Sequence, residues 1–266
     1  MNANSPHLAV RHGRVDGITG DVDVLEDGRS ALWLAVYLDR RDCVEALLAA
    51  GADPWRPMMS GWSPGRLAAA GPHADLFPGG PGLTGAEAAA VAEAPRLRAA
   101  LQDDDYVDEG GSLACVSGID VAEAVRRLGA TTLEGDHEDD EEVDVVGATD
   151  VPGGCVLHQP WGYAAQMPGV TRPLSAGTTC YGVYANPKSG NQGSITRDGE
   201  VVGSDLHPGG EPLEREPADL VLLSYLYRHD ATAYACAYAG LRPTDARAVT
   251  GPPDAWLRLP RTDHRT

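Results

Sequence analysis

The strongest constraint on this chain is a short pattern that recurs after 33 residues, from Gly28 to Gly61. Residues 28–36 read GRSALWLAV and residues 61–69 read GWSPGRLAA, so glycine, serine, leucine and alanine fall at matching positions. Self-similarity at such a period is typical of repeat proteins, in which each unit buries its apolar face only against its neighbours. The pattern therefore predicts a stack of small helical units at the start of the chain.

The segment from Gly28 to Asp53 contains one complete unit. Residues 35–36 (AV) fit the core of a first helix, residues 44–48 (VEALL) carry the apolar stripe of a second, and Gly51 is a helix-ending glycine. This segment resembles the ankyrin repeat, with residues 30–33 (SALW) in the place of the family's usual Thr-Pro-Leu-His. The resemblance implies a helix pair, a fingertip between repeats and a role in binding other proteins.

The flanking copies are partial. Residues 5–13 (SPHLAVRHG) repeat the start of the unit 26 residues early instead of 33, which indicates a shortened N-terminal copy. Residues 61–69 are followed by Gly71-Pro72 without a second apolar helix. Residues 1–77 are thus predicted to hold one complete repeat between two partial ones. Because about three repeats are needed for stability, we expect the end of this array to pack on the chain that follows.

The next segment, residues 78–103, is predicted to be a short linker and an alanine-rich helix. Residues 78–82 (PGGPG) are typical of a linker. Thr84 and Glu87 form a capping box at the start of the helix, which extends to about Leu101. Pro95 lies inside this pattern and is expected to kink or divide the helix.

Residues 104–260 are predicted to form a second domain. A helix begins after Asp120 and ends at Gly129. The acidic run at residues 134–144 is expected to be a solvated loop. Short strands follow, with Asp-Gly at 198–199 as the clearest hairpin turn. The expected strands are 144–148, 155–158, 162–166, 178–185, 193–197 and 200–204.

Two helices, residues 216–228 and 231–239, are expected to end this domain, with one short contact at Trp256-Leu257. Residues 261–266 are expected to be a frayed tail. Consecutive strands joined by tight turns indicate an antiparallel sheet. The predicted fold class is α+β: a short ankyrin-type helical repeat array followed by an antiparallel-sheet domain with flanking helices.

A second resemblance covers roughly residues 104–260. Residues 113–130 (LACVSGIDVAEAVRRLGA), followed by Trp161-Gly162 in a sheet region and a terminal helix pair, resemble a family of uncharacterised actinobacterial domains. The resemblance implies a bacterial origin and no particular activity. Its combination with ankyrin repeats is similar to bacterial interaction or immunity proteins.

Charge limits the classes of partner. The net charge is -18, from 39 acidic and 21 basic residues, which repels nucleic acid and anionic membranes and attracts a basic protein partner. We see neither a signal peptide nor an apolar run of bilayer length, so a cytoplasmic protein is expected. The sequence does not indicate an oligomeric state. The five cysteines are scattered without a CxxC pair, as for buried reduced thiols.

Four residues were considered for chemistry. Cys155 and His158 form a C-x-x-H half-site and Cys180 is a third potential ligand, but no second paired half-site completes a zinc site. Cys155 or Cys180 with His158 or His207 could form a nucleophilic pair, although both thiols lie in apolar strand patterns. We therefore assign no catalytic residue, metal or cofactor.

Two groups of residues are candidates for binding. The fingertip between the repeats is rich in residue types enriched at interfaces, and it gives the candidate partner-binding residues Trp55, Arg56, Met58, Met59 and Trp62. The alternative is that Trp55 and Met58 pack on the second domain. A polar loop and two aromatic residues of that domain give a candidate pocket of Trp161, Tyr163, Lys188, Asn191 and Gln192.

Three functional hypotheses follow. The first is a protein-interaction module, with the repeats as the binding scaffold. The second is an immunity-type or regulatory protein that binds a basic partner through its acidic surface. The third is an enzyme with a pocket in the sheet domain, where Lys188, His158 or Tyr184 would converge.

Overall fold

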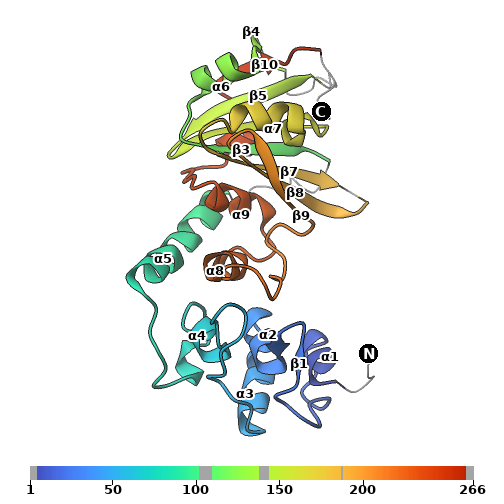
Figure 1. Cartoon of the computed structure of the whole chain (residues 1–266), viewed down its shortest axis with the longest axis vertical. Helices are drawn as coiled ribbons and strands as arrows, with labels where there is room; N and C mark the ends of the chain where they lie inside the picture. Colours follow the sequence, from blue (N-terminus) through green and yellow to red (C-terminus); the bar gives the residue numbers. More distant parts are fainter. Residues whose placement is uncertain (1–4, 102–109, 138–143, 187, 262–266) are drawn as a thin grey trace. The chain divides into compact units, whose positions relative to one another are not determined.

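The computed structural model describes residues 5–101, 110–137, 144–186 and 188–261, and the chain divides into two compact units (Figure 1). The first unit contains the chain up to Ala94 together with residues 211–226. The second contains residues 95–210 and the chain from Tyr227 onward. The predicted boundaries differ from this division, because residues 211–226 were predicted to belong to the domain at 104–260.

Three short helices of the first unit begin in the same way. They are α1 (Pro6–Arg11), α2 (Ala31–Tyr37) and α4 (Pro64–Ala68). Ser5, Ser30 and Ser63 are their N-caps, and each hydroxyl accepts a hydrogen bond from a backbone N–H three residues later, at 3.4, 3.2 and 3.3 Å. Such a cap satisfies one of the unpaired N–H groups of the first turn. The recurring serine therefore sets where each first helix starts.

The helix pair predicted for residues 28–53 is present. After α2, the second helix α3 (Arg41–Ala49) buries Cys43, Val44 and Leu47, and Gly51 follows with a φ of +88°. The third copy has only the short 3-10 helix η1 (Ala74–Leu76) after α4. In the first copy, turns and bends occupy most of the chain between α1 and the next hairpin.

A small hairpin that the sequence analysis did not predict precedes α2. Strands β1 (Leu25–Glu26) and β2 (Arg29–Ser30) pair across the turn residues Asp27 and Gly28, both of which have positive φ, at 51° and 75°. Two successive positive φ values are those of a type I′ turn. A Cβ atom at Gly28 would collide with the side chain of Glu214, so glycine is also needed for close approach. We call residues 23–30 the first finger.

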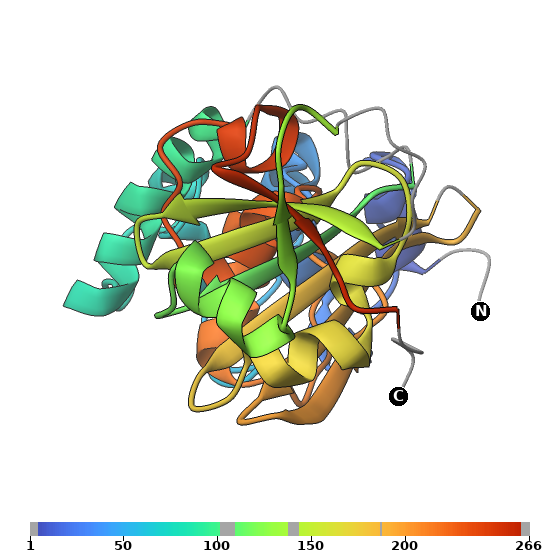
Figure 2. The same ribbon diagram turned by 90° about the horizontal axis from the view of Figure 1, so that it is seen from above.

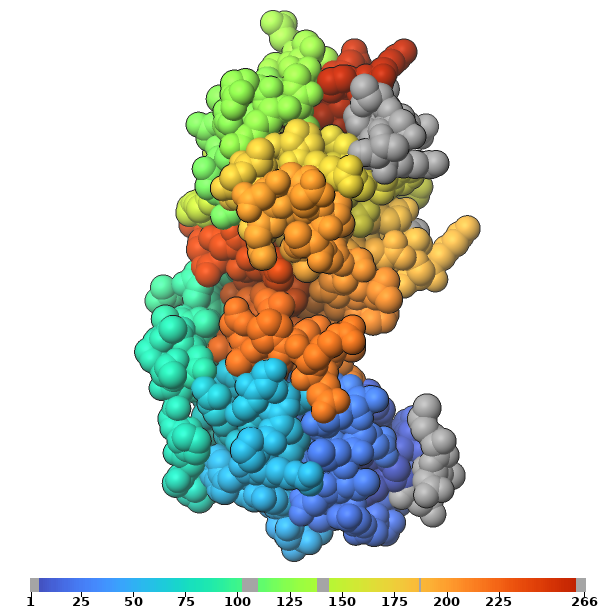
Figure 3. Space-filling view, viewed as in Figure 1, coloured from blue at the N-terminus to red at the C-terminus, as the bar shows by residue number. Residues whose placement is uncertain are grey.

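Helix α8 (Ala218–Leu226) completes the first unit, although Ala218 lies 156 residues after Trp62, whose indole contacts it. The indole N–H of Trp62 donates to the carbonyl of Ala218 at 2.7 Å, and the Tyr37 hydroxyl donates to the carbonyl of Ser224 at 3.2 Å. The Tyr37 ring also lies 5.9 Å from that of Tyr225. Figure 3 shows this segment (orange) lying directly on the repeats (blue and cyan).

Ion pairs fix the start of this segment to the repeats. The carboxylate of Glu211 accepts two hydrogen bonds from Arg11, at 2.5 and 2.9 Å, and lies 2.9 Å from a guanidinium nitrogen of Arg29. Arg29 also donates to the carbonyl of Pro212 at 3.3 Å, and its side chain is only 8% exposed. The hydrogen bonds to Glu211 raise the pKa of Arg11. We call these three charged residues the Glu211 clamp.

Helix α5 (Gly85–Ala100) begins with the predicted capping box. The Thr84 N–H donates to Glu87 at 2.8 Å, and the Glu87 N–H donates to the Thr84 hydroxyl at 3.3 Å. Pro95 was expected to kink or divide the helix, and the helix continues through it, so the proline does not divide it. A proline removes one backbone hydrogen bond while the neighbouring bonds remain. The boundary between the two units falls between Ala94 and Pro95.

The second unit is built on an eight-stranded antiparallel sheet in the order β4-β10-β5-β6-β3-β7-β8-β9. The Asp198-Gly199 hairpin is confirmed, joining β8 to β9 with both residues at positive φ. The strands are β3 (Ser112–Ser117), β4 (Thr131–Leu133), β5 (Val145–Val151), β6 (Gly154–Gln159), β7 (Thr179–Asn186), β8 (Gly190–Arg197), β9 (Glu200–Asp205) and β10 (Ala255–Arg258).

Several elements of this unit differ from the predictions. Strand β3 was not predicted, because it is buried on both faces and its residues do not alternate between apolar and polar. The strand predicted at 162–166 is wrong: it is the 3-10 helix η3 (Ala164–Gln166). Helix α7 (Pro168–Leu174) was missed, since it contains Pro168 and Pro173. The predicted contact at Trp256-Leu257 is part of β10, inside the sheet.

Helices cover both faces of the sheet. Helices α6 (Val121–Leu128) and α7 lie side by side over one face, where Val116, Leu157 and other buried residues form the core (Figure 2). Helix α9 (Ala231–Tyr238) packs on the other face, with Tyr238 4.8 Å from the ring of Tyr181. The short helix α10 (Arg247–Thr250) contacts β5 and β6.

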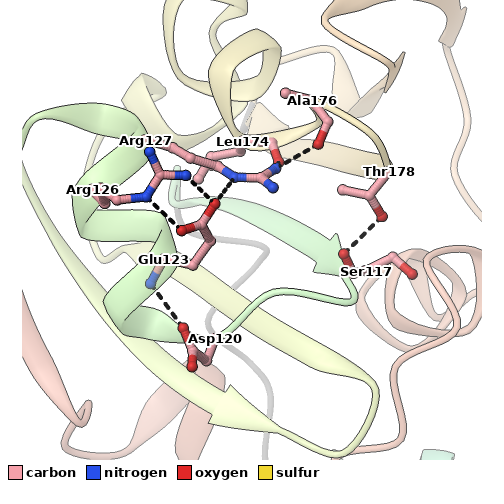
Figure 4. A network of polar contacts seen from close by, with 8 residues as sticks. All are labelled: Ser117, Asp120, Glu123, Arg126, Arg127, Leu174, Ala176 and Thr178. Atoms are coloured by element: carbon pink, nitrogen blue, oxygen red, sulfur yellow. Dashed lines mark hydrogen bonds and ion pairs between the residues drawn. The ribbon is translucent and has the colours of Figure 1, made fainter.

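A polar network joins α6 to the end of α7 (Figure 4). Glu123 accepts hydrogen bonds from Arg126 and Arg127, which lower the pKa of its carboxyl group to about 2. Arg127 in turn donates to the carbonyls of Leu174 and Ala176, at 2.7 and 2.8 Å. These carbonyls lie at the C-terminal end of α7, where backbone acceptors lack partners within the helix. The network therefore holds the two helices together.

Some predicted segments lie outside the described residues. This applies to 138–143 of the predicted acidic loop and to 262–266 of the predicted tail. Among the helices that the structure describes, none is long and apolar enough to cross a membrane.

The Glu211 clamp can be tested by mutation. In Glu211→Gln, the buried Arg29 loses its counterion, so we expect the free energy of unfolding of the first unit to fall by about 2 kcal/mol. Urea denaturation followed by tryptophan fluorescence measures this change. The control is Glu45→Gln, which removes the exposed Arg41–Glu45 pair and should change stability by less than about 0.5 kcal/mol. Equal effects in the two variants would contradict the clamp.

Candidate functional site

Three of the five predicted partner-binding residues are buried inside the first unit. Met58 is 7% exposed, Met59 is 2% exposed and Trp62 is fully buried. The Met58 sulfur accepts a hydrogen bond from the backbone N–H of Ser30 at 3.3 Å, and Trp62 contacts Ala218. These side chains pack within the unit because the array is short and the chain covers its own apolar surface. We therefore leave Met58, Met59 and Trp62 out of the candidate surface.

Trp55 and Arg56 remain at the surface of the second finger, residues 53–60. Trp55 is partly buried: its ring lies edge-on to Phe77 at 6.3 Å and covers Gly65, where a Cβ atom would collide with it. Arg56 is exposed, and its guanidinium donates to the carbonyl of Asp23 at 3.1 Å. Contacts inside the unit thus hold the second finger in place, while the guanidinium of Arg56 stays accessible to solvent.

The two fingers are connected through Asp23. The Asp23 carboxylate accepts a hydrogen bond from the N–H of Asp53 at 2.9 Å, in addition to the Arg56 contact. Next to Asp23, Val24 and Leu25 of the first finger are 40% and 39% exposed. We define the finger surface as Val24, Leu25, Trp55 and Arg56. This surface combines exposed apolar side chains with the cationic side chain of Arg56. The hydrogen bonds of Asp23 hold the two fingers together.

The first finger was not predicted from the sequence as a functional element. The structure has a bend and a turn at residues 15–17, just before it. Residues 15–28 read VDGITGDVDVLEDG and contain five acidic and no basic residues, with valine and leucine between them. This composition was the available signal. It places negative charge next to exposed apolar side chains.

An open cavity of about 670 Å³ adjoins the turn of the first finger. It is lined by Asp27, Arg29 and residues 211–215, of which Leu213 is 56% exposed. Arg29 and Glu211 are bonded to each other in the clamp, whereas Asp27, Glu214 and Arg215 add charges of both signs to the wall.

The candidate pocket residues of the second unit are only partly brought together. Tyr163 lies edge-on to Tyr184 at 6.0 Å, and Tyr184 is the cross-strand neighbour of Gln192. Asn191 is opposite Ala185 in the same hairpin. Trp161 and Lys188 are exposed, the former by 63%.

The cysteine and histidine residues considered for chemistry do not face each other. Cys155 and His158 are three residues apart in β6, so their side chains point to opposite faces of the sheet. They cannot bind one metal ion or form one nucleophile–base pair there. Burial raises the pKa of Cys155 to about 12 and that of Cys180 still higher, and it lowers the pKa of His158 to about 4. A buried protonated thiol is a poor nucleophile.

The convergence expected for an enzyme pocket is likewise not found between His158 and Tyr184. Leu113 is paired with His158 on one side and with Val183 on the other, so these three share a face. Tyr184, next to Val183, points to the opposite face. Among the residues that the structure describes, no cluster of three His, Cys, Asp or Glu side chains could hold a metal ion.

Comparison with known protein families matches residues 27–57 to the ankyrin repeat. The match covers the turn of the first finger, the α2–α3 pair and the start of the second finger. This segment indicates a protein–protein interaction scaffold. No curated protein and no solved structure matches the chain. The resemblance of residues 104–260 to actinobacterial domains gains no support from these comparisons.

The buried His158 predicts a pH dependence of stability. Its pKa is lowered from 6.5 to about 4 by burial, so between these values the unfolded chain binds a proton that the folded chain does not. The free energy of unfolding should thus fall as pH drops through this window, by up to about 3 kcal/mol. Urea denaturation at about pH 7 and about pH 4.5 measures the slope.

The variant His158→Leu should reduce this slope, whatever its effect on stability at neutral pH. His207→Gln, which changes an exposed histidine of the same unit, is the control and should retain the slope. An unchanged slope in His158→Leu would show that other groups cause it.

Proposed function

We propose that this protein is a protein–protein interaction module that binds its partner through the finger surface of the first unit. The supporting observation is the division of the ankyrin face: residues 211–226 cover the side near Tyr37 and Trp62, while Val24, Leu25 and Arg56 of the finger surface stay exposed and Trp55 stays partly exposed. A partner that binds the repeat is therefore expected to contact the finger surface, which residues 211–226 leave uncovered.

The finger surface has the properties of a binding site. Asp23 holds the fingers in register through its bonds to Asp53 and Arg56, so little order has to be gained on binding. Tryptophan and arginine are the side chains that most often dominate interface energies. Val24 and Leu25 supply apolar area beside them.

The expected partner carries positive charge. Residues 15–28 place five acidic residues in the first finger and in the chain just before it, and the whole chain has a net charge of -18. The negative electrostatic potential of these charges accelerates the association with a basic protein and disfavours binding of an acidic one. An immunity-type or regulatory function falls within this proposal, because it also requires an acidic surface that binds a basic partner.

The test uses the native partner, captured on the immobilised full chain and then purified. In the double variant Leu25→Ala/Arg56→Ala, we expect the Kd to increase at least about tenfold, since exposed apolar and arginine anchors contribute most at interfaces. Biolayer interferometry measures the Kd. Binding to the unchanged chain should also weaken markedly from about 50 to about 500 mM NaCl, as screening shortens the reach of charge.

The control is Arg41→Ala, which removes an exposed arginine from α3 outside the finger surface and should leave the Kd within about twofold. Equal affinity of the double variant and the unchanged chain would refute the proposed surface.

A further inference from the structure

A second cavity of the first unit lies between α5 and α8, with a volume of about 550 Å³. We call it the α5–α8 groove. Ala86 and Ala90 line it from α5, and Leu222, Leu223 and Leu226 line it from α8. In Figure 3, α5 (teal) runs beside the repeats (cyan) and α8 (orange). The groove is thus an apolar space between two helices.

The groove exists because one of its walls is made of short side chains. Ala86 and Ala90 are one helical turn apart and face the same side of α5. Their methyl groups do not reach across to α8, so Ala86 stays exposed and Leu223 stays half-buried. Glu87 meanwhile ties α5 to Arg66 of α4 at 2.6 Å. The helix is held in place next to Leu223, which it leaves half-buried, while Leu222 and Leu226 are buried.

The walls determine what form a peptide occupant must take. Residues 84–90 and 218–226 span roughly 9 and roughly 12 Å of helix, about two turns. Both walls are helical, so their backbone groups are already hydrogen-bonded and cannot pair with an extended strand. A peptide in this apolar space must satisfy its own backbone, which an α-helix does.

Charged side chains at the rim of the groove indicate which residue types should flank the apolar stripe of that helix. Asp219 lines the groove and is exposed in the first turn of α8, and Glu87 lines it from α5. Glu87 is neutralised by Arg66, which leaves the Asp219 carboxylate as an accessible negative group. A lysine or arginine beside the apolar stripe of the occupant would meet it.

We propose that the α5–α8 groove binds an amphipathic helix of a partner protein, two turns long, with an apolar stripe flanked by basic residues. The groove takes apolar side chains at spacings of three and four residues, and Asp219 pairs with a flanking cation. This inference rests on the proposed function of the first unit as an interaction module. It uses none of the residues of the finger surface, so the two sites are tested separately.

The test uses the full chain and three fluorescein-labelled synthetic peptides. The first is an amphipathic helix with leucine at positions i, i+4 and i+7 and lysine flanks, the second has glutamate flanks, and the third has a central proline. Fluorescence anisotropy should show saturable binding of the lysine peptide with a Kd of about 1–50 µM. The glutamate and proline peptides should bind at least about tenfold more weakly.

Variants locate the site. Ala90→Arg fills the groove from α5 and should weaken binding of the lysine peptide at least about tenfold. Ala89→Arg adds the same charge at an exposed neighbouring position outside the groove and is the matched control. Asp219→Asn should weaken binding about two- to fivefold, whereas Asp42→Asn on the exposed side of α3 should have little effect.

Several results would overturn the proposal. It fails if no peptide binds saturably, if Ala90→Arg and Ala89→Arg bind equally, or if the proline peptide binds as well as its parent. If Leu25→Ala/Arg56→Ala abolishes peptide binding and Ala90→Arg does not, the finger surface is the site and the proposed function stands without the groove. Saturable binding of a small apolar dye without binding of any peptide would also exclude a helical occupant.

Discussion

The first unit depends on the burial of α8 against the repeats. Tyr225, fully buried, lies against Tyr37, which is itself stacked on Trp33 with ring centroids 5.3 Å apart. An ankyrin repeat cannot bury its apolar side alone, and here one complete repeat has only partial neighbours. A helix from a distant part of the chain supplies the missing cover. Hydrogen bonds from Tyr37 and Trp62 to carbonyls of α8 fix its position.

This arrangement decides which parts of the repeat are available. The surface around Met58, Met59 and Trp62 is used inside the unit, so binding must use what remains outside. The finger surface remains outside, and so does the groove that α8 forms with α5. The segment at 211–226 therefore both stabilises the repeats and creates a wall of a new site. The charge of residues 15–28 adds a preference for basic partners.

The sequence predicted those features whose cause is local. The helix pair at 28–53, the Thr84–Glu87 capping box and the Asp198-Gly199 hairpin each depend on residues a few positions apart. The assignment of 211–226 failed because its apolar stripe looks the same whichever core it packs on. Strand β3 was not predicted for a related reason. Burial on both faces removes the alternation of apolar and polar residues that marks a strand.

The candidate site shows the same limit. Of the predicted partner-binding residues, Arg56 is exposed and Trp55 partly exposed, whereas Met58, Met59 and Trp62 belong to similar residue types but are buried. Residue type indicates a capacity for contact, and only the tertiary structure shows whether the contact is internal. The α5–α8 groove could not be predicted, because its two walls come from segments more than a hundred residues apart.

Native-state hydrogen exchange of the full chain tests the central claim most directly. If α8 is an integral part of the repeat unit, the amides of α2 and α8 should exchange through one common opening, with equal free energies that shift together with urea. The variant Tyr37→Phe, which removes the hydrogen bond to Ser224, should lower both by the same amount. Fast exchange of α8 while α2 remains fully protected would show that the repeats are stable without it and would contradict this account.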